Sequence, residues 1–276
     1  MMDGERSGGG GGEDRHDAEG AGPRSVVIPR ARRLLRGVRH RVAALYAIAG
    51  LILSVGFLLA ILGIWMLAGL TEEVVEGETL RFDEGVLLWL DARATPTLDV
   101  IALEITALGN WLVVAVIVAV AVALLSILGR RESAALILAA VVGAAAINPV
   151  LKAIFDRPRP ELFEWRAHYA GSSSFPSGHA MASTVLFAVL AYVVHRLTTS
   201  RSISALAAAV AMTLVLLVGG SRLYLGVHYP SDVVAGFIAG FVWVTFCAIT
   251  LEVVWPRWSA RRVASGCGTS EAEGAG

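Results

Sequence analysis

Long uninterrupted runs of apolar residues alternate with short polar segments along most of this chain. About 20 apolar residues in an α-helix cross the hydrocarbon core of a bilayer, so each run predicts a membrane-spanning helix. The fold class predicted is therefore all-α, a polytopic membrane protein built as a bundle of six transmembrane helices. The six spans are expected at residues 43–70, 110–129, 133–155, 178–197, 203–221 and 230–254.

The segment 95–108 differs from these runs. Its apolar residues recur at helical spacing, but Asp99 and Glu104 interrupt them. This pattern predicts an amphipathic helix that leads into the second span and is not a span of its own.

The two ends of the chain have a different composition from the middle. Residues 1–23 are rich in Gly and acidic residues and carry too few large apolar groups to fold, so a disordered tail is expected. Residues 24–42 form a basic juxtamembrane segment, which either lies on anionic lipid or acts only as a topology signal. The membrane domain is expected over residues 43–254, and residues 255–276 form a second tail.

Composition excludes a soluble domain, because 56% of the residues are hydrophobic, only 17% are charged, and the mean hydropathy is +0.67. The net charge of zero hides an uneven distribution. Threading six spans places both termini and the turns 130–132 and 195–202 on one face of the membrane. That face carries the arginines nearest the membrane, which marks it as cytoplasmic. These are Arg24, Arg30, Arg32, Arg33, Arg36, Arg39, Arg41, Arg130, Arg131, Arg196, Arg201, Arg257, Arg261 and Arg262.

The opposite, outer face holds the loops 71–109, 156–177 and 222–229. The first of these loops is acidic, and the other two carry clusters of polar residues. A seven-span topology would separate the clusters across the bilayer, so the six-span topology is favoured. We therefore expect a multi-pass protein of the plasma membrane, with cytoplasmic termini and a site that faces outside.

The first cluster contains the only lysine in the chain, Lys152, followed by Arg159 and Pro160. Two X-Pro steps after Asp156 hold this segment extended. The guanidinium fork of arginine suits phosphate oxygens. Arg157, between the two, is expected to pair with Asp156, with contact to a lipid headgroup as the alternative.

The second cluster is Pro176-Ser177-Gly178-His179, at the start of the fourth span. Proline fits the first turn of a helix. The backbone N–H groups of Ser177 and Gly178 are expected to point outward at a helix N-terminus, where an anion is favoured. His179 is then placed to pass a proton to a leaving oxygen. A capping turn with an interfacial histidine is the alternative.

The third cluster joins Ser221-Arg222 at the end of the fifth span to His228 and Asp232 at the start of the sixth. With Pro230 in the first helical turn, Asp232 lies about one turn from His228 and can accept a hydrogen bond from one ring nitrogen. The other ring nitrogen is then available as a nucleophile. Asp232 would hold His228 in one tautomer, as a buried aspartate orients the histidine of a serine protease triad. Taken alone, a histidine and an aspartate at this spacing favour a simple helix-terminal acid at Asp232.

Together the clusters resemble the three-part signature of the type 2 phosphatidic acid phosphatase family, also called lipid phosphate phosphatases. No motif position departs from that pattern, and the resemblance covers residues of about 80 to 254. It implies that His228 attacks phosphorus, that His179 protonates the leaving group and later activates water, and that Asp232 orients His228. The resemblance implies phosphate binding by Lys152, Arg159, Ser177, Gly178 and Arg222.

The resemblance implies two kinds of partner for the protein, a lipid phosphate substrate and the surrounding membrane lipids. No metal, cofactor or nucleic acid is expected, and the oligomeric state is left open. Undecaprenyl pyrophosphate is favoured over phosphatidate and phosphatidylglycerol phosphate, because its recycling requires dephosphorylation on the outer face. Trp165, His168 and Tyr169 are expected at headgroup level.

Three alternatives come from other classes. Vanadate-dependent haloperoxidases share the signature but are soluble, which six apolar spans argue against. A lipid phosphotransferase would use the same residues and differs only in its acceptor. A transporter or non-catalytic membrane protein is the third, and the near absence of charge from the centres of the spans argues against it.

Overall fold

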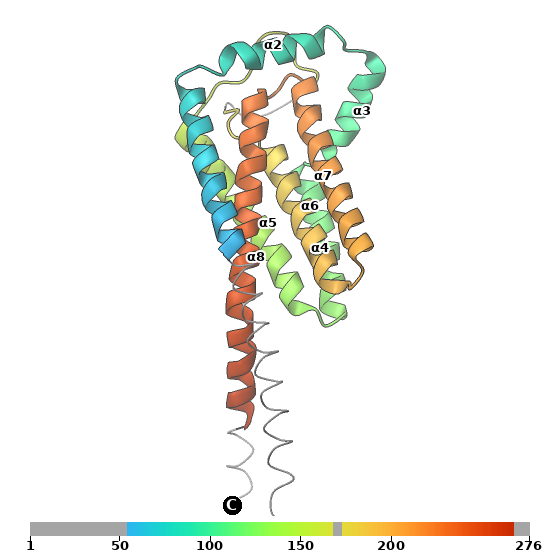
Figure 1. The fold of residues 1–276 in the computed structure, drawn as a ribbon. Helices are drawn as coiled ribbons and strands as arrows, with labels where there is room; N and C mark the ends of the chain where they lie inside the picture. Colours follow the sequence, from blue (N-terminus) through green and yellow to red (C-terminus); the bar gives the residue numbers. More distant parts are fainter. Residues whose placement is uncertain (1–53, 168–172, 268–276) are drawn as a thin grey trace, which may run out of the picture. The chain divides into compact units, whose positions relative to one another are not determined.

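The computed structural model describes residues 54–167 and 173–267, and side chains as far as residue 252 (Figure 1). Every regular element in these ranges is an α-helix, as the hydropathy pattern predicted. The expected tail 1–23, the basic segment 24–42 and the last residues of the C-terminal tail lie outside the described residues. The helices are Ser54–Val75, α2 (Leu80–Asp91), α3 (Pro96–Ala107), α4 (Trp111–Ile127), α5 (Arg131–Phe155), α6 (Gly178–Leu197), α7 (Arg201–Tyr224) and α8 (Pro230–Cys267).

Five helices among the described residues are long and apolar enough to cross a membrane: Ser54–Val75, α5, α6, α7 and α8 as far as Glu252. The second predicted span is different, because α4 has only 17 residues and reaches about 26 Å. It follows α3 after a bend of 46°, and the bent pair passes the same test together. The expected six crossings are therefore reached when α3 and α4 form one broken span.

The expected outer loop 71–109 is mostly helical, which corrects the sequence prediction. The first described helix continues to Val75, and α2 follows after a short turn. The predicted amphipathic lead-in is present as α3, which begins with Pro96 and is capped by the Thr95 side chain. Figure 1 shows α2 lying across the end of the bundle, where it contacts α7 and α8.

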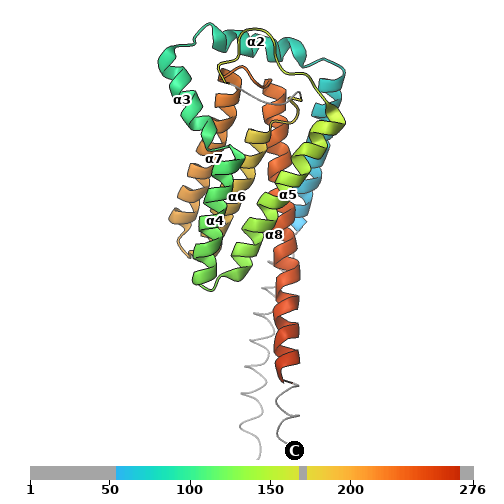
Figure 2. The ribbon, with the colours of Figure 1, turned by 180° about the vertical axis from the view of Figure 1, so that it is seen from behind.

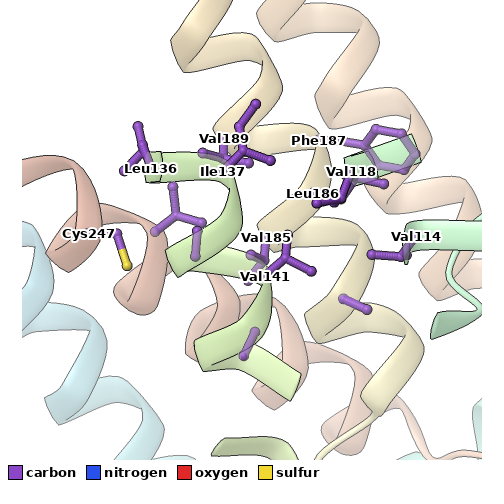
Figure 3. Packing of buried hydrophobic residues seen from close by; sticks show 14 of the residues in the cluster. Val114, Val118, Leu136, Ile137, Val141, Val185, Leu186, Phe187, Val189 and Cys247 are labelled. Carbon is purple, nitrogen blue, oxygen red and sulfur yellow. The ribbon is translucent and has the colours of Figure 1, made fainter. Parts of the chain in front are cut away.

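The central helix of the bundle is α6, which packs against α4, α5, α7 and α8 (Figure 2). Its side chains are buried along most of its length, and α4 and α5 contribute facing apolar residues (Figure 3). Small residues let the helices approach closely. A Cβ atom at Gly236 on α8 would lie 2.7 Å from the Ser177 carbonyl oxygen, and one at Gly240 would lie 2.8 Å from Thr184 Cβ. These glycines bring the N-terminal halves of α6 and α8 together, next to the second polar cluster and to His228 and Asp232 of the third.

Candidate active site

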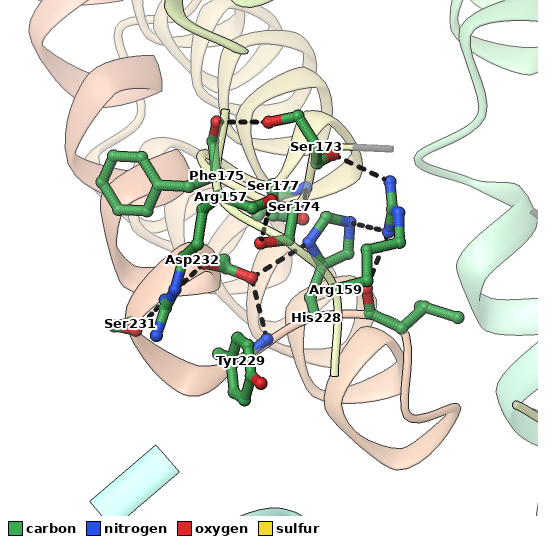
Figure 4. Close-up of polar contacts among 12 residues, drawn as sticks. Arg157, Arg159, Ser173, Ser174, Phe175, Ser177, His228, Tyr229, Ser231 and Asp232 are labelled. Carbon is green, nitrogen blue, oxygen red and sulfur yellow. Dashed lines mark hydrogen bonds and ion pairs between the residues drawn. The ribbon is translucent and has the colours of Figure 1, made fainter. Parts of the chain in front are cut away.

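The three polar clusters meet at one end of the helix bundle, although they are far apart in the sequence. Lys152 lies in the last turn of α5, and the extended segment 156–160 follows that helix. The second cluster surrounds the N-terminus of α6, and the third joins the end of α7 to the start of α8. Figure 4 shows members of all three in contact.

His228 and Asp232 form a wholly buried pair at the start of α8. The Nδ1 atom of His228 lies 3.4 Å from Oδ2 of Asp232, at the one-turn spacing that the sequence predicted. The same carboxylate oxygen accepts the Tyr229 backbone N–H at 2.9 Å. Burial lowers the pKa of His228 to about 3, and Asp232 opposes this shift only in part. The imidazole is therefore neutral near pH 7, which is the form that can act as a nucleophile or base.

The other ring nitrogen of His228 faces a cation. Its Nε2 atom lies 3.4 Å from Nη1 of Arg159, whose side chain is buried (Figure 4). Arg159 also donates to the Val227 carbonyl at 2.7 Å and to the Ser173 carbonyl at 3.1 Å. Lys152 donates to the same Ser173 carbonyl at 2.8 Å. The shared Ser173 carbonyl brings Lys152 next to Arg159, whose guanidinium lies beside the imidazole.

The second cluster is arranged differently from the sequence prediction. Pro176 lies before the helix and not in its first turn, and α6 begins at Gly178 with Ser177 as N-cap. The Ser177 N–H donates to the Asp232 carbonyl at 2.9 Å, so it is not directed outward as expected. The reason is the close approach of α8 at Gly236. Gly178 is itself enclosed, since a Cβ atom there would lie 3.0 Å from Oδ1 of Asn148.

His179 is buried beside the break between α3 and α4. A Cβ atom at Gly109 would lie 3.1 Å from both the Cβ and the carbonyl oxygen of His179, so the break packs directly on this residue. The site residues close enough to His179 to influence its protonation are Arg222, His228, Arg159 and Lys152.

Arg222 lies buried in the last turn of α7. Its Nη1 atom donates to Oγ1 of Thr106 on α3 at 2.8 Å. Ser221 beside it donates to the Val218 carbonyl within its own helix. The lead-in helix α3 therefore helps to hold a predicted phosphate-binding arginine, a role that its sequence did not indicate.

Arg157 has different partners from the one expected. It pairs with Asp232 at 2.7 Å and with Asp83 on α2 at 3.0 Å, and not with Asp156. Asp156 is the left-handed C-cap of α5. Sequence reasoning missed Asp83 because it belongs to an acidic segment assigned to a loop. A signal was present in the sequence, since Asp83 stands one helical turn before the apolar Leu87. In the structure, both side chains are fully buried on the same side of α2.

The remaining expectations concern the segment 161–172. The indole of Trp165 donates to the Pro160 carbonyl at 2.6 Å, which ties this residue to the first cluster. His168 and Tyr169 lie outside the described residues. Within the described part of the chain, no group of three or more His, Cys, Asp or Glu side chains is arranged to hold a metal ion.

An apolar groove of about 570 Å³ runs between α4 and α5. One end is marked by Pro149, one turn before Lys152, and by Trp111, two residues after Gly109. The groove follows α5 from Pro149 to Leu138, a distance of about 16 Å. It therefore leads from the level of the polar site into the apolar part of the bundle.

Comparison with known proteins gives consistent matches. Residues 133–255 match the model of the PAP2 superfamily. Phosphatidylglycerophosphatase B of Bacillus subtilis is 39% identical over 97 residues, which are 35% of this chain and 47% of the relative. The putative undecaprenyl-diphosphatase YbjG of Escherichia coli is 33% identical over 103 residues, 36% of this chain and 44% of the relative. This chain thus spans about half the length of the curated relatives it matches.

The crystal structure of a transmembrane PAP2-type phosphatidylglycerolphosphate phosphatase from Bacillus subtilis is similar in fold. It superposes with a TM-score of 0.65 at 25% identity, over 68% of this chain and 94% of that one. The matched segment 133–255 contains all three polar clusters.

Proposed function

From the premise that this chain is a membrane protein of the PAP2 superfamily, as its three motifs predicted, we propose that it hydrolyses a phosphomonoester or diphosphate of a lipid. The observation that carries the proposal is the buried His228–Asp232 pair with Arg159 beside the Nε2 atom of His228. A neutral imidazole that faces the Asp232 carboxylate at Nδ1 and the Arg159 guanidinium at Nε2 is suited to attack an anionic phosphorus centre.

The reaction would proceed in two steps. Nε2 of His228 attacks phosphorus, an N–P bond forms, and the P–O bond to the leaving group breaks while His179 supplies a proton to the leaving oxygen. Water then attacks phosphorus with His179 as base, an O–P bond forms, and the N–P bond breaks to release phosphate. Asp232 stabilises the positive charge that His228 carries in the intermediate.

Phosphate binding is proposed for Lys152, Arg159, Ser177, Gly178 and Arg222. The three cations come from three different segments and lie around the histidines. Their charge would stabilise the oxygens of the transferring phosphoryl group, the kind of electrostatic preorganisation that is often the largest catalytic contribution. The Ser177 N–H is engaged by Asp232, so the contribution of Ser177 would come from its hydroxyl and that of Gly178 from its N–H.

A lipid substrate is supported by the position of the site beside an apolar groove and within a membrane bundle. The groove offers a place for an acyl or prenyl chain while the phosphate reaches the cations. Undecaprenyl pyrophosphate, phosphatidate and phosphatidylglycerol phosphate are the candidates. The names of the two curated relatives favour the first and the third.

The proposed location is the plasma membrane, with the site on the outer face and the termini in the cytoplasm. Support comes from the arginines at the opposite end of the bundle from the site. Arg130 precedes α5 and Arg131 is its first residue, and Arg196 and Arg201 flank the turn between α6 and α7. Such residues mark cytoplasmic ends of membrane helices.

The proposal is tested by phosphate release from the three lipids with purified protein in detergent and EDTA. His228→Ala is the control, and a phosphoryl group on the protein is sought after rapid denaturation in alkali. We expect both phosphate release and a phosphoryl group on the protein in the wild type, and neither in His228→Ala. No release from any lipid by folded protein would refute hydrolysis, whereas transfer to an added lipid alcohol in place of water would identify a phosphotransferase.

A further inference from the structure

We propose that Asp83 on α2 and Arg157 in the segment after α5 are positioning residues that hold Asp232, and through it His228, in the reactive orientation. The inference rests on the proposed function, because it concerns the histidine that would attack phosphorus. Neither residue belongs to the three motifs from which the site was predicted.

The first observation is how Arg157 divides its hydrogen bonds. Its Nη2 atom donates to Asp83 at 3.0 Å, while its Nη1 atom donates to Asp232 at 2.7 Å and to the Ser231 hydroxyl at 2.7 Å. The guanidinium also lies over the Tyr229 ring, 4.2 Å from its centroid. A planar fork with both edges engaged and one face packed has a single orientation. The position of Arg157 is therefore set by Asp83.

The second observation is how the carboxylate of Asp232 is oriented. Arg157 binds Oδ1, and the Tyr229 N–H binds Oδ2, the oxygen that lies 3.4 Å from His228 Nδ1 (Figure 4). With Oδ1 anchored, rotation of the carboxylate is restricted, and Oδ2 stays directed at the imidazole. Without that anchor, the oxygen that selects the tautomer of His228 would lose its fixed direction.

The third observation is that Asp83 also caps α8. Its Oδ1 atom accepts the Ser231 N–H at 3.0 Å, and its Oδ2 atom accepts the Ser231 hydroxyl. The first N–H groups of a helix have no partner within it, and a carboxylate there also favours the helix dipole. Here the cap comes from a residue 148 positions earlier in the chain. Asp83 thereby fixes the helical turn that carries Asp232.

The fourth observation is burial. The side chains of Asp83 and Asp232 are 1% and 0% exposed, and that of Arg157 is 11% exposed. Two carboxylates in such a place require the cation between them, since buried charges persist when they are paired and hydrogen-bonded. A surface ion pair could be removed without consequence, but this arrangement links the covering helix α2 directly to the catalytic pair.

The test compares Asp83→Asn and Arg157→Lys with wild type and with Glu84→Gln as matched control. Glu84 is the next residue of α2 and is only half-buried. Asp83→Asn keeps the shape but loses the charge, and Arg157→Lys keeps the charge but loses the planar fork that holds the two carboxylates with separate nitrogens. We expect kcat to fall about 10- to 100-fold in each variant, with KM within about twofold, as for loss of a charge-assisted hydrogen bond acting on the reactive group. Glu84→Gln should retain wild-type kinetics.

Two further measurements separate positioning from simple loss of structure. Thermal unfolding in detergent gives the folded fraction of each variant at the assay temperature. The nitrogen NMR signals of His228, assigned by their loss in His228→Ala, report its tautomer directly. We expect these signals to move in Asp83→Asn and Arg157→Lys and to stay in place in Glu84→Gln.

The inference is overturned if the variants keep wild-type kcat, if kcat falls only with the folded fraction, or if the His228 signals do not move. The NMR measurement requires no turnover. If wild-type protein released no phosphate, the proposed hydrolysis would fail, while the His228 signals would still decide whether Asp83 and Arg157 hold this residue.

Discussion

Substituting Gly236 by alanine tests whether the close contact between α6 and α8 assembles the site. A Cβ atom at this position would lie 2.7 Å from the Ser177 carbonyl oxygen, 2.9 Å from Ala180 Cβ and 3.2 Å from the Met181 nitrogen. Two of these neighbours are backbone atoms, which cannot turn away as a side chain can. The helices must therefore separate by about 0.7 Å to restore ordinary van der Waals contact.

That separation acts on the site through a single hydrogen bond. The Asp232 carbonyl accepts the Ser177 N–H at 2.9 Å, and this bond joins the two helix ends that carry His179 and His228. Misplacement of reacting groups by about 1 Å can cost 100-fold in rate. For the smaller displacement we expect kcat to fall about 10-fold. Overpacking should also lower stability by about 1–3 kcal/mol.

The assay is phosphate release by purified protein, with thermal unfolding measured in the same detergent. The matched control is Gly220→Ala on α7, where a Cβ atom would meet nothing within 4 Å. This control should keep its activity and gain up to about 1 kcal/mol from helix propensity. If Gly236→Ala were as active and as stable as Gly220→Ala, the reasoning from the helix contact would be refuted.

Three further predictions follow from the site and its surroundings. Burial lowers the pKa of His228 from 6.5 in the unfolded chain to about 3 in the folded protein. Between these pH values the unfolded protein binds more protons than the folded protein. The contribution of His228 to the free energy of unfolding should therefore fall as the pH decreases from about 6.5 toward 3. The His228 NMR signal should stay that of a neutral ring down to about pH 4, and protonation near pH 6 would contradict this environment. Replacing Ala145 in the groove between α4 and α5 by Trp should raise KM for long-chain lipid phosphates about 10-fold and leave KM for a water-soluble phosphate ester unchanged; equal changes for both would exclude the groove as a chain site. Thr106→Val should raise KM about 10-fold, since it removes the hydroxyl that accepts from Arg222 at 2.8 Å, and unchanged kinetics would show that α3 does not hold this arginine.

The sequence was most informative where short segments carry their own physical requirement. The predicted span 178–197 coincides with α6, and the predicted end of the third span at residue 155 is the end of α5. Hydropathy succeeds here because a bilayer demands an apolar helix of nearly constant length. The pairing of His228 with Asp232 was also predictable, because the two residues stand four positions apart where α8 begins.

Predictions failed where the partner of a residue lay far away in the chain. Arg157 was assigned to its neighbour Asp156, but its partners are 74 and 75 positions distant. The Ser177 N–H was expected to point outward, but α8 covers it through its carbonyl at Asp232. The helix α2 was taken as loop because its apolar stripe is short and lies within an acidic segment.

The amino-acid sequence by itself determined the all-helical membrane class, the long spans and the identity of the motif residues. These properties depend on local composition, on helix length and on residues that share a turn. Only the tertiary structure decided that α3 and α4 are bent at Gly109 against His179, and that Gly236 brings α8 onto the start of α6. It also decided that Asp83 reaches the His228–Asp232 pair through Arg157. Such contacts form between helices that are distant in the sequence. They depend on how whole helices pack and on which buried charges pair, and both are determined only in the assembled bundle.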